Sequence, residues 1–240
     1  MTLFPVAPTF HPADAAFAEP ARNAYGDLPE WRLDDLYPGM ESDQLKADLA
    51  RADTASTAFE TRYKGKLGEI AVSPDAGALL AEAVVAFEKL EELLGRIVSY
   101  AGLLHAGDTS DPVRSKFYGD VQEKITNASA HLLFFALELN RIDDTVLEVA
   151  MRHPALGHYR PFLEDIRKEK PYQLEDRVEQ LFHEKSVSGR GAWNRLFDET
   201  MTALRFEVGG EKLALEPVLN MLQDADEAKR HRASDALAAT

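Results

Sequence analysis

Two long stripes of apolar side chains, separated by a short polar segment, constrain the fold of this chain most strongly. The first stripe advances in steps of three and four residues and comprises Leu80, Val84, Phe87, Leu90, Leu94, Ile97, Ala101 and Leu104. The second comprises Phe117, Val121, Ile125, Ala128, Leu132, Phe135 and Leu139. This spacing places each stripe on one face of a helix, and some thirty helical residues span roughly 45 Å. Because neither helix can bury its stripe alone, the sequence predicts an antiparallel helical hairpin.

Capping residues mark where the helices begin. Ser73 precedes Pro74 and Asp111 precedes Pro112, which is the favoured order of a cap followed by proline. Ser42 is a plausible N-cap for an earlier helix that Gly65 ends. Shorter helices are expected at about 143–152, 159–169, 174–187, 190–203 and 216–222, and from 226 onward.

One segment departs from the helical period. Leu204, Phe206 and Val208 alternate with polar residues, and Gly209-Gly210 can form a two-residue hairpin turn. The predicted fold class is therefore mainly α: a helical bundle built on a long antiparallel helix hairpin, with one small β-hairpin near residues 204–215.

The two ends of the chain differ from its middle. Residues 1–27 contain four prolines and no apolar period, which predicts a flexible N-terminal arm. In residues 28–40 we expect Trp31, Leu36 and Tyr37 to dock on the helical body. The last helical pattern reaches Thr240 without a glycine cap or a proline stop, so we expect a truncated protein.

Composition excludes several classes of function. The net charge of −14 repels phosphate backbones and anionic lipids, so neither nucleic acid nor a membrane is an expected partner. The absence of cysteine excludes disulfides, thiolate metal sites and cysteine nucleophiles. No signal peptide is visible, and the apolar runs are too short to span a bilayer. A cytoplasmic protein is expected.

The dipeptide His183-Glu184 could begin the His-Glu-x-x-His motif of a zinc site. That motif needs a second histidine four residues after the first, and this position is Val187. Glu179 and His183 could hold an ion weakly but lack a third ligand. Paired Glu-x-x-His motifs, which build di-metal sites in helical bundles, do not occur. We interpret His183-Glu184 as part of a solvated helix face.

The remaining candidates have simple structural interpretations. His105 and His131 could form a switch or a ligand pair, but structural roles are favoured. His153 and His158 are interpreted as loop and cap residues. Neither a phosphate-binding loop nor a Gly-x-Ser-x-Gly elbow is present. No catalytic, cofactor-binding or metal-ligating residue is therefore assigned.

Three segments of the chain form a pattern in a fixed order. The segment LPEWRLDDLYPG contributes Trp31, Leu33, Asp35, Leu36 and Tyr37. The segment YRPFLEDIRKEKPYQLEDRVEQLF contributes Phe162, Leu163, Glu164, Lys170, Pro171, Leu174 and Glu179. The segment SGRGAWNRLFDE contributes Gly189, Ala192, Trp193, Leu196 and Phe197. Together they resemble the N-terminal region of the oligoendopeptidase F family of M3-type zinc metallopeptidases, with departures at Arg32, Asp34 and Tyr172.

The resemblance implies a non-catalytic N-terminal portion of a zinc-dependent oligoendopeptidase that hydrolyses short peptides. It implies a helical N-terminal domain at 28–203, which shapes the substrate channel, and the start of a truncated peptidase domain at 204–240. Zinc would be bound by the absent C-terminal domain, because the family's His-Glu-x-x-His lies downstream and no position here matches it. The expected partners are that domain and the parent's short peptide substrates.

A free-standing helical adaptor or binding module without catalysis is the alternative. A fragment should leave an apolar patch near residues 217–240 exposed, whereas an independent module should bury its own faces. Tyr37, Tyr100 and Tyr159 could line a channel, although burial of these aromatic rings is favoured.

Overall fold

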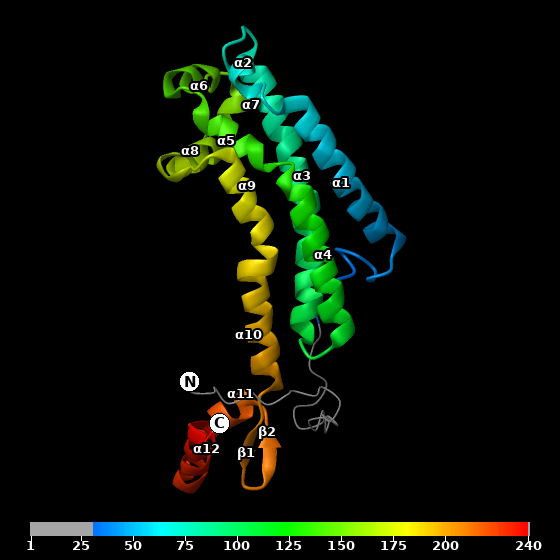
Figure 1. Ribbon diagram of the computed structural model, residues 1–240, viewed down its shortest axis with the longest axis vertical. Helices are drawn as coiled ribbons and strands as arrows, with labels where there is room; N and C mark the ends of the chain where they lie inside the picture. Colours follow the sequence, from blue (N-terminus) through cyan, green and yellow to red (C-terminus); the bar gives the residue numbers. More distant parts are fainter. Residues whose placement is uncertain (1–30, 240) are drawn as a thin grey trace, which may run out of the picture. The chain divides into compact units, whose positions relative to one another are not determined.

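Helices account for most of residues 31–239, which are the residues that this computed structural model describes (Figure 1). The predicted flexible arm at 1–27 lies outside the described residues. The residues from Arg32 onward form one compact unit.

The predicted antiparallel hairpin is confirmed. Helix α3 (Ala76–Gly107) packs along α4 (Pro112–Ala130), and α1 (Asp43–Tyr63) contacts both (Figure 1). Asp111 caps α4 as predicted, because its Oδ1 accepts hydrogen bonds from the backbone N–H groups of Val113 (2.7 Å) and Arg114 (3.3 Å). Ser42 caps α1 by accepting from Leu45 N at 3.4 Å.

The second stripe is carried by two helices rather than one, which corrects the prediction. Helix α4 ends at Ala130 and α5 (Leu133–Arg141) begins three residues later. The N–H groups of His131 and Leu132 donate to Ala128 O (3.2 Å) and Ser129 O (2.9 Å), three residues back. These shorter-range bonds tighten the last turn and interrupt the α-helical pattern.

The start of α3 was also predicted wrongly. Ser73 does not cap it; its Oγ instead donates to Ile70 O at 2.8 Å, at the end of α2 (Leu67–Ala71). Helix α3 begins at Ala76, with Asp75 in the N-cap position. The sequence analysis did not anticipate α2, and Ser73 belongs to the end of that helix.

The smaller helices agree with the expected ranges to within a few residues. They are α6 (Asp144–Ala150), α7 (Pro154–Gly157), α8 (Arg160–Glu169), η1 (Lys170–Tyr172), α9 (Asp176–Lys185), η2 (Val187–Gly191), α10 (Ala192–Ala203), α11 (Leu215–Met221) and α12 (Glu227–Ala239). Of these, α7, η1 and η2 were not predicted as separate helices.

The predicted β-hairpin is confirmed. Strands β1 (Phe206–Val208) and β2 (Glu211–Leu213) pair antiparallel, with Phe206 opposite Leu213 and Val208 opposite Glu211. Gly209 and Gly210 have φ values of 63° and 87°, which a two-residue turn of this kind requires. The hairpin packs with α11 and α12 around a small core made of Phe206, Val208, Val218, Ala233 and Ala236.

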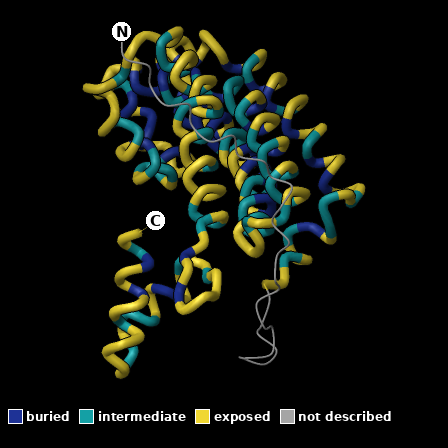
Figure 2. The backbone as a smooth tube through the Cα atoms, turned by 60° about the horizontal axis from the view of Figure 1, so that its bottom comes forward, coloured by how far each residue is buried: buried dark blue, intermediate teal, exposed yellow. Residues whose placement is uncertain are grey.

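The main core lies between the hairpin helices, α1 and the short helices α2 and α5–α8. Figure 2 shows its buried residues gathered where these helices meet. Phe135 is fully buried and stacks on Phe87, with ring centroids 4.7 Å apart. Phe59 packs edge-on against Phe135, with ring centroids 5.2 Å apart. The two predicted stripes therefore share one aromatic-rich core.

The segment before α1 is anchored by Tyr37. Its ring is 1% exposed, and its hydroxyl donates to Asp48 Oδ2 at 2.8 Å. Arg96 of α3 pairs with the same carboxylate and donates to the tyrosine oxygen at 3.2 Å. Burial raises the pKa of the Tyr37 hydroxyl, and its bond to Asp48 adds to that rise. Leu36 packs on the core as predicted. Trp31 belongs to the other unit and is 66% exposed, so its docking on the helical body stays a prediction.

Helix α3 approaches the α6–α7 junction closely at Gly77. A Cβ at this position would lie 2.3 Å from His153 Cβ and 2.7 Å from Ala150 O. We expect Gly77→Ala to lower the free energy of unfolding by about 1–3 kcal/mol, because the added methyl group overpacks the contact. Urea unfolding measures the change.

Gly95 of the same helix provides the control, since nothing lies within 4 Å of the methyl group that alanine would add there. At this position the same substitution should stabilise by up to about 1 kcal/mol, because alanine favours helix. Equal stabilisation by both substitutions would contradict the close contact at Gly77.

Candidate interaction face on α9 and α10

Helix α9 is joined to α10 by η2. None of the residues in these three elements is buried. The backbone is kinked at Gly189, whose φ of −96° and ψ of −108° are not helical. A Cβ at the neighbouring Gly191 would lie 3.0 Å from Ser186 O. The glycines of the SGRG segment thus allow two helices to follow one another through a tight join.

One side of these helices is held to the hairpin by polar contacts. The Nε2 atom of His183 lies 2.9 Å from Ser129 Oγ and 3.2 Å from Thr126 O. Arg195 donates to Gln122 Oε1 at 3.0 Å. Further along α10, the hydroxyls of Thr202 and Thr109 are 2.9 Å apart. These contacts define the side that faces α4 and the α3–α4 turn.

The opposite side carries large apolar residues that nothing in the described chain covers. On a helix, residues two apart point roughly 200° away from each other. Leu181 is two residues from His183 and therefore points away from it. Trp193 and Phe197 are each two residues from Arg195 and likewise point away from it. We define the apolar face as six residues that are between 48% and 70% exposed: Leu174 just ahead of α9, Leu181 and Phe182 on α9, and Trp193, Leu196 and Phe197 on α10.

This location corrects an expectation. The exposed apolar patch was expected near residues 217–240, where Val218, Ala233 and Ala236 are instead buried in the small core. Within the described part of that segment, Leu219 is the one large apolar residue classed as exposed, at 37%. The uncovered apolar surface therefore lies on α9 and α10.

The residues considered for a metal site do not converge. Glu184 accepts a hydrogen bond from Gln180 at 2.8 Å, and Glu179 accepts from Leu174 N at 2.9 Å. His183 Nε2 carries its proton when it donates to the Thr126 carbonyl, so that nitrogen is not free to bind a metal. Among residues 31–239, no group of three or more such side chains has metal-site geometry.

The other histidines have separate partners. His105 stacks on Tyr118, with ring centroids 5.1 Å apart, whereas His131 Nδ1 lies 2.5 Å from Glu60 Oε2. His153 and His158 occupy the N-cap and C-cap positions of α7. The structure therefore does not bring His105 and His131 together as a pair.

The three tyrosines considered for a channel also have structural environments. Tyr37 and Tyr100 are buried, with ring centroids 5.3 Å apart. Tyr159 is half-buried, and its hydroxyl donates to Glu88 at 2.7 Å. The favoured interpretation as packed aromatic rings holds for Tyr37 and Tyr100.

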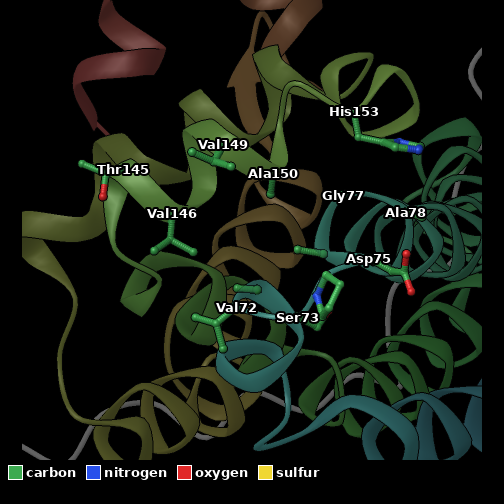
Figure 3. A pocket seen from close by; sticks show the side chains of 13 residues that line it. Val72, Ser73, Asp75, Gly77, Ala78, Thr145, Val146, Val149, Ala150 and His153 are labelled. Atoms are coloured by element: carbon green, nitrogen blue, oxygen red, sulfur yellow. The ribbon is translucent and has the colours of Figure 1, made fainter.

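A depression of about 560 Å³ lies between the α2–α3 turn and α6, and the sequence analysis did not identify it. Figure 3 shows Val72 and Ser73 on one segment, and Val146 and Val149 on the other. Its lining is mostly small and apolar, with Asp75 and His153 as the titratable residues. No hydrogen bond or ion pair joins Asp75 to His153 within residues 31–239.

We expect His183→Ala to lower the free energy of unfolding by about 0.5–1.5 kcal/mol, because it removes hydrogen bonds between α9 and α4. The zinc content of the dialysed protein should not change. Thermal unfolding and elemental analysis measure the two effects, with His231→Ala at an exposed position as the control. A loss of bound zinc in His183→Ala alone would overturn this interpretation.

Helices α9 and α10 also carry charges of both signs. Asp176 raises the pKa of Arg141, its hydrogen-bonded partner on α5. Lys185 and Arg190 lie near the join, and Asp198 and Glu199 follow on α10. The two helices therefore combine exposed apolar side chains with charges of both signs, as protein-binding surfaces do.

None of the helices within residues 31–239 combines the length and the apolar character needed to cross a membrane.

Comparison with known proteins gives consistent matches. A family described as Oligopeptidase F matches residues 138–206, which include the whole apolar face. The chain is 27% identical over 218 residues to Oligopeptidase PepF of Bacillus subtilis (strain 168), covering 86% of this chain and 31% of that protein. The crystal structure of oligoendopeptidase-F from Enterococcus faecium aligns with a TM-score of 0.63 and 19% identity, over 81% of this chain and 36% of that one.

These coverages, 31% and 36%, mean that the chain spans about a third of the length of the relatives. The structural match, at its low identity, shows the shared fold. The predicted resemblance is confirmed: the chain matches the N-terminal region of the oligoendopeptidase F family of M3-type peptidases.

Proposed function

We propose that this chain is the N-terminal, non-catalytic portion of a zinc-dependent oligopeptidase that hydrolyses short peptides. The observation that carries the proposal is the match over 218 residues to an oligopeptidase of which the chain covers only 31%. Peptidases of the M3 family are zinc-dependent in general. The parent enzyme would act in the cytoplasm, with short peptides as substrates.

The described residues do not fit zinc. His183, Glu179 and Glu184 are engaged in separate hydrogen bonds and face different neighbours. A catalytic zinc site needs three protein ligands that converge on one point and leave a fourth position open. We therefore assign the metal and its chemistry to the part of the parent outside this chain.

The role of this chain is to shape the channel that admits peptides. The long hairpin supports this role, because its core of packed aromatic rings makes it a rigid wall. Residues 28–203 would form the helical N-terminal domain. Residues 204–240 would be the start of the peptidase domain, and their separate small core supports that division.

A peptidase assay tests the proposal. The purified chain of 240 residues, supplied with zinc, should not hydrolyse a fluorogenic peptide above the buffer rate. The endogenous protein, isolated through a tag on its gene, should cleave the same peptide and lose this activity when a chelator removes zinc. Zinc-dependent hydrolysis by the chain alone would refute its non-catalytic role.

A free-standing helical binding module is the second candidate. The observation that favours it is the small core of Phe206, Val208, Val218, Ala233 and Ala236, because an independent module is expected to bury its own faces near residues 217–240. This candidate predicts an endogenous protein of the same length as the chain, without any peptidase activity.

A further inference from the structure

We infer that the apolar face of α9 and α10 is the docking surface for the remaining, C-terminal portion of the oligopeptidase, which meets it with an apolar surface. This inference rests on the proposed function and names the part of the chain that would make the contact. The occupant is protein, and its contacting surface is neutral and rich in aliphatic or aromatic side chains.

The first argument is the contrast between the two sides of these helices. The α4 side is fixed by hydrogen bonds from His183, Arg195 and Thr202. The outer side presents an apolar stripe along both helices, although neither helix buries a residue within residues 31–239. An amphipathic helix normally turns its apolar stripe inward, so this orientation indicates that a second surface covers the stripe.

The second argument is the free energy available from covering the face. Burying an exposed leucine or phenylalanine side chain is favourable in proportion to the apolar area that it removes from water. Trp193, Phe182 and Phe197 are 70%, 65% and 63% exposed, so most of that contribution is still available. Aromatic residues at the centre of a face are the usual anchors of protein interfaces.

The third argument identifies the occupant. The face lies inside the residues that match the oligopeptidase F family, 138–206. This chain covers 31% of the length of the B. subtilis relative, so the relative is a much longer protein. That additional protein is the occupant that this comparison supports.

The fourth argument concerns the chemistry of the occupant. The charged residues on the same helices are of both signs, with Lys185 and Arg190 near the join and Asp198 and Glu199 beyond Trp193 in the sequence. No single sign of charge dominates, so a strongly charged partner such as a polyanion is not favoured. The contact should therefore depend little on salt.

Hydroxyl-radical footprinting tests the inference, because the chain has only two tryptophans. Trp193 lies in the apolar face at 70% exposure, and Trp31 lies outside it at 66% exposure. Both should react at similar rates in the isolated chain at low concentration. In the endogenous protein, purified by a tag on its gene, Trp193 should react at least about fivefold more slowly relative to Trp31. The buried Phe135 provides a second control, since it should stay unreactive in both proteins.

Cross-linking identifies what covers the face. An amine-reactive cross-linker attached at Lys185, beside the face, should link to peptides that follow residue 240 of the same polypeptide. Lys116 of α4 is the control; its side chain is 76% exposed and lies on another helix. Lys116 should give few or no such links.

The outcomes separate this inference from the proposed function. A long endogenous protein in which Trp193 stays as reactive as Trp31 would overturn the docking surface and leave the proposed function intact. Protection of Trp193 in the isolated chain that rises with concentration would also overturn it, because a second copy would then be the occupant. An endogenous protein of 26.7 kDa would refute both.

Discussion

Replacing Phe135 by alanine is expected to lower the free energy of unfolding by about 3–5 kcal/mol, which is the largest effect that we predict for one substitution. Phe135 is fully buried and contacts Phe87, Phe59 and Phe134, with ring centroids between 4.7 and 6.3 Å away. Removing the ring forfeits its transfer free energy and leaves a cavity between the hairpin and α1. Urea unfolding followed by circular dichroism measures the change.

Phe182→Ala is the matched control, because this phenylalanine lies on the apolar face at 65% exposure. In the isolated chain its substitution should change the free energy of unfolding by no more than about 0.5 kcal/mol. A loss of stability in Phe182→Ala as large as in Phe135→Ala would contradict the assignment of one residue to the core and the other to an uncovered face.

The second large effect is expected at Asp48. Its carboxylate is largely buried, accepts the Tyr37 hydroxyl bond at 2.8 Å, and pairs with both Arg96 and Arg51. Asp48→Ala should lower the free energy of unfolding by about 2–3 kcal/mol, because it leaves a buried hydroxyl without its acceptor and Arg96 without its carboxylate. Arg96 is a third exposed, so water partly replaces the lost ion pair and limits the effect.

A double-mutant cycle attributes this effect to the Tyr37 contact. Tyr37→Phe and Asp48→Ala together should cost less than the sum of the two single substitutions, by at least about 0.5 kcal/mol. Asp53→Ala, at an exposed position of the same helix, should be close to neutral. Strict additivity of Tyr37→Phe and Asp48→Ala would show that the hydrogen bond contributes nothing to anchoring the segment before α1.

The helices could be predicted from the sequence because their apolar periods are long and their caps are local. Asp111 caps the helix that directly follows it, and Gly209-Gly210 form the turn between two adjacent strands. Both roles depend only on neighbouring residues, so the sequence alone predicts them. Ser73 was misassigned because two short-range interactions compete there. Its hydroxyl can cap a following helix or bond back to the helix before it, and only the presence of α2 decides.

The break in the second stripe was not visible for a related reason. Leu132 and Phe135 continue the apolar period across the break, so the pattern of burial gives no signal of it. Tyr37 anchors the segment before α1 through its polar partners, and Leu36 packs on the same core. The polar partner that matters, Asp48, lies eleven residues away and could not be identified from the sequence.

The apolar face could be predicted only in part from the sequence. Its residues Trp193, Leu196 and Phe197 were identified through the resemblance, but their exposure was not. Which side of a helix is covered depends on the neighbour that packs on it, and here that neighbour is α4. The exposed patch expected at 217–240 was misplaced because the β-hairpin, α11 and α12 bury one another's apolar residues.

The central claim is that this chain is the non-catalytic N-terminal portion of a longer oligopeptidase, and the intact mass of the endogenous protein tests it most directly. An antibody against this region, followed by mass spectrometry of the captured protein, gives that mass. The account predicts a mass far above the 26.7 kDa of this chain, with peptidase activity in the same fraction. A mass of 26.7 kDa, without activity, would contradict it and favour the free-standing binding module.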